Sequence, residues 1–175
     1  MKVREVFKNE YVQTVVPLVI VLIGTFTFWF GLRVALNTER PLLAVASGSM
    51  EPTLLVGDLI VVRGLNPAEI VAAPYPDGDI IVFHRPTNPD ELIVHRAISN
   101  FTSGGILYFE TKGDANLSPD KWPVPQNYVV GKVVGRVQWL GYITLFVRTP
   151  TGMLVMVMLF VLILFVEYVP FPWRK

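Results

Sequence analysis

Two uncharged apolar runs, one near each end of the chain, constrain its fold more than any other feature. Residues 15–32 and 149–166 are each 18 residues long and contain no charged side chain. A helix needs about 20 apolar residues to cross a hydrocarbon core about 30 Å thick. Both runs are apolar on all faces, and a domain of about 100 residues could not bury two such helices in its core. We therefore predict two transmembrane helices, at residues 12–36 and 143–169, around a single domain at residues 37–142.

A cleaved signal peptide is an alternative interpretation of the first run. Lys2, Arg4 and Lys8 would form its basic region, and residues 44–46, Ala-Val-Ala, resemble a cleavage site. The apolar run is too long for that role, however, and the small residues lie too far beyond it. Cleavage there would also cut the chain just before the serine motif described below. We therefore expect a helix that is retained.

Basic residues beside the two runs predict how the chain is oriented in a membrane. Lys2, Arg4 and Lys8 precede the first run, and Arg174 and Lys175 follow the second. Three arginines on the inner flanks, Arg33, Arg40 and Arg148, weaken this excess of basic residues at the outer ends. Because cytoplasmic flanks are enriched in Lys and Arg, we expect the termini, residues 1–11 and 170–175, in the cytoplasm. The domain at residues 37–142 is then expected outside, where the sequons at Asn100 and Asn116 are open to glycosylation if the cell has the machinery.

Composition excludes several kinds of site. The chain has no cysteine, which removes disulfides, cysteine catalysis and thiolate metal sites. Residues 41–138 contain seven basic and ten acidic side chains, so this part of the chain carries a net charge of −3. A nucleic-acid-binding surface needs a basic patch, so we expect no nucleic-acid partner.

The middle of the chain has the pattern of an antiparallel β domain with little helix. Short apolar, β-branched and aromatic runs alternate with Gly, Pro, Asn and Asp, which is typical of strands joined by turns. We predict a hairpin connection at residues 86–90, a loop or short helical turn at residues 66–78, and bulges or close backbone approaches at Gly131 and Gly135. Residues 139–142 are expected to join the domain to the second span. The predicted strands lie within residues 54–62, 79–84, 91–98, 106–111 and 129–139.

A serine motif follows the extended stretch at residues 42–46. Residues 47–53 read Ser-Gly-Ser-Met-Glu-Pro-Thr. Glycine permits a tight turn that exposes a neighbouring hydroxyl and directs backbone N–H groups at one point, although such a motif is also common in flexible loops. A serine nucleophile needs a base to take its proton. Both histidines, His84 and His95, lie in β-type runs and precede an arginine, so spacing does not choose between them.

Two aspartates, Asp114 and Asp120, share one loop at residues 113–120. The loop has the composition of an Asx-rich turn or of a loose calcium site. It lacks the glycine and the distal glutamate of an EF-hand, so calcium is not expected.

Taken together, these segments resemble the boxes of type I signal peptidases, in the same order along the chain. The resemblance covers residues 42–142. It is carried by Ser-Gly-Ser-Met-Glu-Pro-Thr-Leu at 47–54, Gly-Asp at 57–58, Ile-Val-His-Arg at 93–96, Thr-Lys-Gly-Asp-Ala-Asn at 111–116 with Asp120, and Gly-Lys-Val-Val-Gly-Arg at 131–136. The bacterial branch has a lysine base where this chain has His95, which is similar to the archaeal and endoplasmic-reticulum branch.

The resemblance implies roles for individual residues. Ser49 would be the nucleophile and His95 the general base. Asp120 would orient the imidazole, with Asp114 next to the site or sharing that role. Ser47 and the Ser49 N–H would form an oxyanion hole, whereas His84 matches no box. The resemblance implies no metal and no cofactor.

The resemblance also implies a substrate and a place in the cell. The substrates would be signal-peptide-bearing preproteins cut after small residues, commonly Ala-X-Ala, and the partners would include the lipid bilayer and the protein-export translocon. We expect an integral protein of an archaeal cell membrane with its catalytic domain on the outer face. The alternatives are a non-catalytic β-domain subunit that binds exported chains and an accessory subunit of a transporter. Neither span carries the charges that a transport pathway would need.

Overall fold

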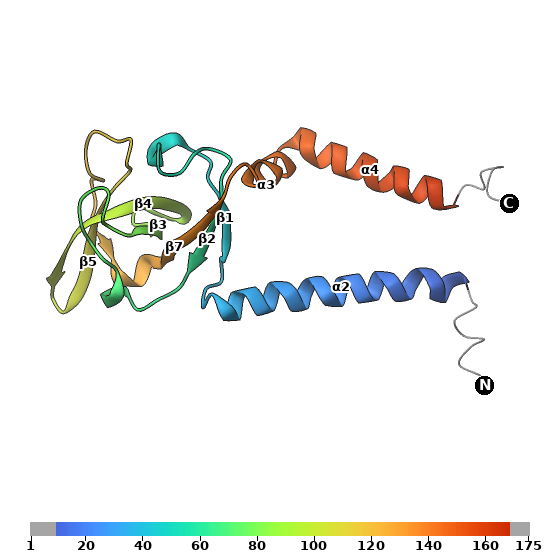
Figure 1. The fold of residues 1–175 in the computed structure, drawn as a ribbon, viewed down its shortest axis with the longest axis horizontal. Coiled ribbons are helices and arrows are strands. Elements are labelled where there is room, and N and C mark those ends of the chain that lie inside the picture. The colour runs from blue at the N-terminus through green and yellow to red at the C-terminus, as the bar shows by residue number, and fades with distance from the viewer. Residues whose placement is uncertain (1–9, 169–175) are drawn as a thin grey trace.

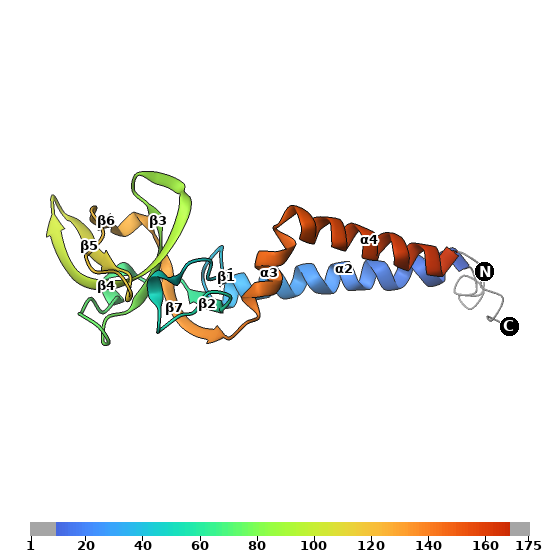
Figure 2. The ribbon, with the colours of Figure 1, turned by 90° about the horizontal axis from the view of Figure 1, so that it is seen from above.

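A β domain with two apolar helices leaving it in one direction makes up the molecule, in a computed structural model that describes residues 10–168 (Figures 1 and 2). The predicted cytoplasmic ends lie outside these residues, apart from positions 10 and 11. The helices and the β domain occupy opposite ends of the molecule, so the β domain projects away from both helices.

The β domain is a single seven-stranded sheet in the order β1-β2-β7-β3-β4-β5-β6. Every neighbouring pair is antiparallel, which confirms the predicted antiparallel β fold. Each predicted run contains or overlaps a strand, and the hairpin expected at 86–90 joins β3 to β4; β6, only two residues long, was not predicted. The strands are β1 Leu42–Ala44, β2 Leu59–Arg63, β3 Ile80–Arg85, β4 Asn88–Ser103, β5 Ile106–Lys112, β6 Val124–Pro125 and β7 Val129–Val137.

Strand β7 contains the two irregularities expected at its glycines. Its register with β2 shifts between Val61 and Val62, opposite Gly135, and its register with β3 shifts between Val82 and Phe83, opposite Gly131. At Gly131 a Cβ atom would lie 2.4 Å from the carbonyl oxygen of Arg63, so only glycine fits there. Such bulges bend and twist a strand, which lets the sheet curl.

The curled sheet has apolar clusters on both faces of β3, because successive side chains of a strand point to opposite faces. One cluster contains Val82 and the other contains Ile81 and Phe83. Met50, which follows Ser49 in the chain, is 1% exposed in the first cluster. Full burial of a methionine stabilises a fold by about 1.5–3 kcal/mol, so this contact anchors the serine motif to the core.

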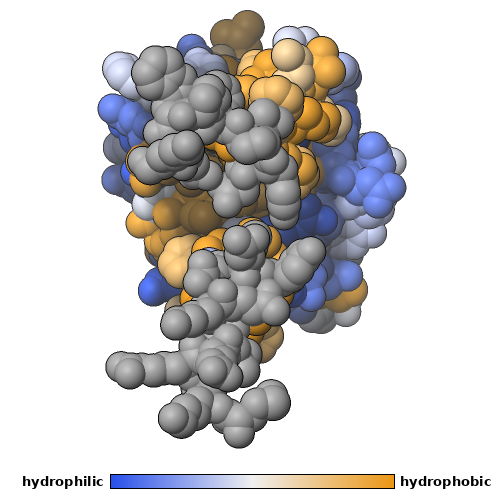
Figure 3. All heavy atoms as spheres, turned by 90° about the vertical axis from the view of Figure 1, so that its right-hand side faces the viewer, coloured by the Kyte–Doolittle hydropathy of each residue, from blue (hydrophilic) through white to orange (hydrophobic). Residues whose placement is uncertain are grey.

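Helix α2, Glu10–Ala35, contains the first apolar run. Its segment Val15–Ala35 is long and apolar enough to cross a membrane, and none of that window is buried. In the view along the helices, apolar residues gather around the described parts of both helices, and hydrophilic residues lie behind and to the sides (Figure 3).

The prediction of one continuous second helix at 143–169 was wrong. The segment forms α3, Gly141–Val147, and α4, Pro150–Tyr168, which meet at a bend of 89°. The residue before a proline avoids helical backbone angles, and Pro150 opens the new helix without a free N–H. The Thr149 hydroxyl donates to the carbonyl of Phe146 and accepts from the N–H of Gly152, so it closes one helix and caps the next. Within residues 10–168, one helix alone meets the length and composition of a span, or two segments do if α3 and α4 count as one broken span.

Candidate active site

Ser49 lies on a single turn of 3₁₀ helix, Gly48–Met50, that follows the edge strand β1. The chain enters the turn through Ser47 in extended conformation and leaves it through Glu51, whose N–H donates to the carbonyl of Gly48 at 3.1 Å. The Ser49 carbonyl accepts from the N–H of Ala115 at 2.9 Å. The burial of Met50 on one side therefore leaves the half-buried Ser49 hydroxyl at the surface of the domain.

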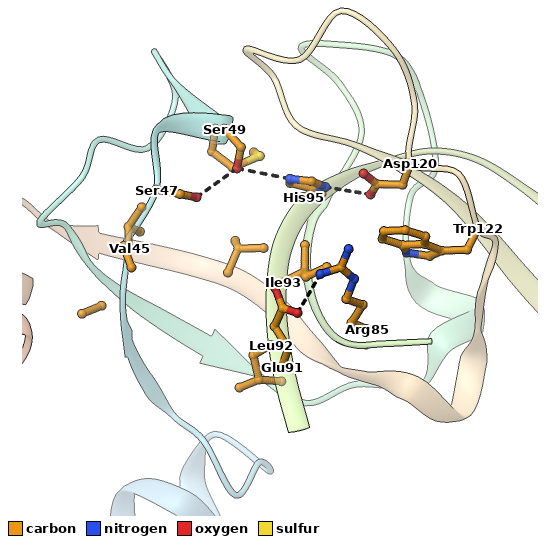
Figure 4. Close-up of a pocket in the computed structure, with 14 residues that line it drawn as sticks. Val45, Ser47, Ser49, Arg85, Glu91, Leu92, Ile93, His95, Asp120 and Trp122 are labelled. Atoms are coloured by element: carbon orange, nitrogen blue, oxygen red, sulfur yellow. Dashed lines mark hydrogen bonds and ion pairs between the residues drawn. The ribbon is translucent and has the colours of Figure 1, made fainter. Parts of the chain in front are cut away.

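His95 lies in β4, opposite Ile81 of β3, and its side chain is 9% exposed. Its Nε2 atom is 3.2 Å from the Ser49 hydroxyl oxygen, within hydrogen-bond distance (Figure 4). The edge of the Phe83 ring packs near the imidazole, with the ring centroids 6.4 Å apart. The sheet thus brings a serine and a histidine together that are 46 positions apart in the sequence.

Asp120 lies on the other side of the imidazole. Its Oδ2 atom is 2.7 Å from His95 Nδ1 and also accepts a hydrogen bond from the Thr111 hydroxyl at 2.6 Å. An ionised carboxylate can only accept, so this contact places a proton on Nδ1 and leaves Nε2 of a neutral imidazole free to accept from Ser49. Serine, histidine and aspartate therefore form a continuous chain of hydrogen bonds.

Asp114 makes different contacts, although it belongs to the same loop. Its carboxylate accepts two hydrogen bonds from Arg96, at 2.8 and 2.6 Å, and one from the Thr53 hydroxyl at 2.5 Å. Arg96 also donates to the carbonyls of Pro76 and Gly78. The structure thus places Asp120 against the imidazole and Asp114 in a buried ion pair beneath the serine motif.

Several residues without a predicted role support the serine motif. Arg136 of β7 donates to the Thr53 carbonyl and lies 3.4 Å from the buried carboxylate of Asp58. Thr53 is therefore held at its backbone by Arg136 and at its hydroxyl by Asp114. These residues all lie within the motifs that resemble signal peptidases, so their positions in those motifs could have identified them from the sequence.

The two remaining candidates lie apart from this support. The Ser47 hydroxyl is 3.3 Å from the Ser49 hydroxyl, on the side away from His95 (Figure 4). The His84 ring bonds through Nδ1 to the carbonyl of Pro89, and His84 does not line the cavity that contains Ser49. Within residues 10–168, no group of three or more His, Asp or Glu side chains could hold a metal ion.

The Ser49 hydroxyl opens into a cavity of about 370 Å³. One wall is the segment from Ala44 to Ser47 and the other is the β4 segment from Glu91 to His95. The first wall continues the edge strand β1 beyond Ala44, and within residues 10–168 β1 pairs only with β2. The second wall is an unpaired edge of β4, because β5 pairs with β4 only from Arg96 onward. The rest of the lining includes Met50 and a polar and aromatic group, in which Arg85 bonds to Glu91 at 2.8 Å and lies 4.7 Å over the ring of Trp122.

This arrangement supplies the parts of nucleophilic catalysis. A hydroxyl with an imidazole at hydrogen-bond distance can lose its proton as it attacks, and a carboxylate on the far nitrogen orients that imidazole. The cavity between two strand edges can accept an extended chain.

Comparison with known proteins agrees with the resemblance to signal peptidases. The family model described as "Signal peptidase, peptidase S26" matches residues 8–100, a range that includes Ser49 and His95. The signal peptidase complex catalytic subunit SEC11 of Tuber melanosporum is 32% identical over 156 residues, covering 82% of this chain and 83% of the relative. The subunit of the same name from Sclerotinia sclerotiorum is 34% identical over 133 residues, covering 72% of this chain and 74% of the relative.

Proposed function

The chain belongs to the signal peptidase family, peptidase S26, and on that premise we propose that it is a membrane-bound serine endopeptidase that removes signal peptides from exported preproteins after small residues. The observation that supports this most strongly is the chain of hydrogen bonds from Ser49 through His95 to Asp120.

In the proposed reaction, Ser49 Oγ attacks the carbonyl carbon of the scissile bond and His95 Nε2 takes its proton. The tetrahedral intermediate collapses when the C–N bond breaks, and the imidazolium gives the same proton to the leaving amine. Water then attacks the acyl-enzyme with His95 again as base, which releases the signal peptide and regenerates Ser49. Asp120 keeps Nδ1 protonated and stabilises the imidazolium.

Negative charge on the substrate oxygen needs hydrogen-bond donors near Ser49. We assign this role to the Ser49 N–H and the Ser47 hydroxyl, which lies 3.3 Å from Ser49 Oγ. Asp114 acts through position alone: it holds Thr53 and Arg96 and thereby fixes the segment that carries Ser49.

The preprotein would bind as an extended strand between the free edges of β1 and β4. Strand addition uses backbone hydrogen bonds for affinity and pockets on alternate positions for specificity. Ala44, Val45 and Ile93 line the cavity beside Ser49, which suits small apolar side chains of the Ala-X-Ala kind.

Two membrane anchors would hold the enzyme at the surface where its substrates emerge. The apolar α2 is the first, and we propose α4, preceded by the bend, as the second. Confinement to the bilayer plane raises the effective concentration of a signal peptide that lies in the same bilayer. We further propose that the catalytic domain faces away from the cytoplasm and that the enzyme works beside the translocon or in a signal peptidase complex. The archaeal source stays a prediction, since the relatives named above are fungal.

A serine-reactive covalent probe tests the proposed chemistry. The full-length protein in detergent is expected to be labelled on the peptide containing Ser49, and Ser49→Ala is expected to remain unlabelled. A non-catalytic subunit that only binds exported chains would not be labelled at Ser49.

A further inference from the structure

A second cavity, of about 510 Å³, continues from the cavity beside Ser49 toward the helices. The two cavities share four lining residues, Ala44, Ala46, Leu92 and Val94, which belong to the two walls of the first cavity. The far end of the second cavity is lined instead by Trp29 of α2, by Arg40 and Asp90, by Thr144 of α3, and by Arg148, the residue directly after α3. The two cavities therefore form one groove that runs from Ser49 to the apolar helix α2.

Strands β1 and β4 run in the same direction along this groove. Three strands separate them in a sheet whose neighbours are all antiparallel, so the two point the same way. Arg40 precedes β1 and Asp90 lies early in β4, whereas Ser49 and His95 lie farther along the chain. A preprotein with its N-terminal part in the bilayer would therefore lie parallel to both edges, with its cleavage site at Ser49.

The length of the groove gives a position in the substrate. Seven residue steps separate Arg40 from Ser47, and an extended chain rises about 3.3 Å per residue, so these positions are at most about 23 Å apart. A substrate strand of the same rise would place its residue about six or seven positions before the scissile bond at the level of Arg40.

The far end of the groove carries an excess of positive charge. Arg40 and Arg148 are both exposed, and neither takes part in an ion pair within residues 10–168. Asp90 is the only acidic residue in this lining, which leaves one uncompensated positive charge. By contrast, the ion pair that Arg85 and Glu91 form near Ser49 has no net charge.

We propose that Arg40 and Arg148 form a charge-selective entrance for the polar substrate segment between the membrane-embedded part of the signal peptide and the cleavage site. This inference rests on the proposed function. A glutamate about six or seven residues before the scissile bond is attracted to the two guanidinium groups, and a lysine there is repelled. Each exposed charge pair changes affinity by up to about fivefold, so we expect kcat/KM to be about tenfold higher for glutamate than for lysine.

The test uses the full-length enzyme with three preproteins that differ only by Glu, Gln or Lys at that position. Three variants are compared with wild type: Arg40→Gln/Arg148→Gln, Arg40→Glu/Arg148→Glu, and the control Arg63→Glu, an exposed arginine of β2 that lines neither cavity. Wild type and Arg63→Glu are expected to cleave in the order Glu, Gln, Lys. The glutamine pair should lose the preference for Glu, because Asp90 is then the only charge in that lining, and the glutamate pair should clearly prefer Lys. If the glutamate pair does not fold, the test rests on whether the glutamine pair loses the preference for the Glu substrate.

The assay is repeated in vesicles of phosphatidylcholine alone and of phosphatidylcholine with phosphatidylglycerol. If the arginines bind anionic lipid headgroups instead, the variants will lower cleavage of all three substrates alike, and only when phosphatidylglycerol is present; that result overturns the proposal. Wild-type rates for Glu and Lys within twofold of each other overturn it too. An enzyme that cleaves no preprotein at all refutes the proposed function itself, and the entrance with it.

Discussion

Each polar side chain around Ser49 has one set of partners, and those partners decide what it can do. Asp120 accepts from the imidazole and from Thr111, whereas Asp114 accepts from Arg96 and Thr53. A carboxylate that already neutralises a buried guanidinium cannot reach the imidazole without leaving that charge unpaired. The two aspartates therefore differ in their partners although they are six positions apart, and we propose different roles for them.

The first prediction separates the two histidines. His95→Ala is expected to lower kcat for preprotein cleavage by several orders of magnitude, because Ser49 loses the group that takes its proton. His84→Ala should keep most of the activity, since this ring bonds to the Pro89 carbonyl and lines no wall of the cavity. Rates are measured on folded protein in detergent. Activity that survives in His95→Ala but not in His84→Ala would mean that His84, rather than His95, is the base.

The second prediction separates the two aspartates by using two readouts. Asp120→Asn is expected to lower kcat by about 10⁴ with a modest change in stability, because an amide carries no charge to stabilise the imidazolium and its NH2 group can donate to Nδ1, which fixes the wrong tautomer. Asp114→Asn leaves the Arg96 charge buried without a counter-charge, and breaking such a pair costs about 3–5 kcal/mol of unfolding free energy. Denaturation curves and kcat are measured for both variants. The assignment fails if Asp114→Asn is as stable as wild type but loses more kcat than Asp120→Asn.

Motif positions, rather than physical reasoning from composition, made the candidate residues predictable. Resemblance to a family placed Ser49 and His95 in boxes, and the structure brings them to hydrogen-bond distance. The difference between Asp114 and Asp120 could not be read from the sequence beyond a ranking, since both lie in one loop. It depends on Arg96 and Thr53, which approach from two other segments.

At the scale of elements, the turn that carries Ser49 is fixed by the loop that carries the aspartates. The Ser49 carbonyl accepts from Ala115, and Gly113 packs directly against the same carbonyl. A Cβ atom on Gly113 would lie 2.5 Å from that oxygen. Because the neighbour is backbone rather than a flexible side chain, the turn itself would have to move.

The third prediction follows from that contact. Gly113→Ala is expected to lower kcat at least 10²-fold, because displacing a catalytic group by about 1 Å can cost that much. Gly135→Ala is the matched control, since a Cβ there would lie 3.8 Å from Val61, an ordinary contact. Both variants are assayed on one preprotein, with denaturation curves alongside. Equal activity of the two variants would mean that the loop does not set the position of Ser49.

Strands were predictable as elements because alternation, β-branched residues and turn residues all act locally. The runs that contain or overlap β1–β5 and β7 are examples. The pair Val124–Pro125 has no such pattern, and β6 exists only because β5 lies beside it. The break between α3 and α4 was missed for a different reason. The apolar run at 149–166 lies almost entirely within α4, but the predicted helix extended back from it to residue 143. That extension crosses the bend, which depends on Pro150 and on the hydrogen bonds of Thr149.

At the scale of the whole molecule, both helices leave the β domain in the same direction (Figures 1 and 2). Two membrane crossings in this arrangement would return the chain to the side of the membrane from which it started. The excess of basic residues beyond the outer ends of the runs favours the cytoplasm for that side.

The fourth prediction tests this topology, and the absence of cysteine makes it simple. Single-cysteine variants Lys2→Cys, Ser103→Cys and Lys175→Cys are exposed to a membrane-impermeant maleimide in intact cells. Ser103→Cys, at the end of β4, should be labelled at once, and the two terminal variants only after permeabilisation. The cysteine-free parent is the background control. Labelling of Lys175→Cys in intact cells while Lys2→Cys stays protected would mean that α4 does not cross the membrane.

If Ser49 is the nucleophile of a signal peptidase, Ser49→Ala removes the group that attacks the preprotein. The full-length wild type and variant are incubated in detergent with one preprotein, and release of the signal peptide is measured together with the denaturation curve of each protein. We expect a folded variant whose rate is lower by several orders of magnitude, because the members of such a unit act together. A folded Ser49→Ala protein that cleaves within tenfold of wild type would show that Ser49 is not the nucleophile.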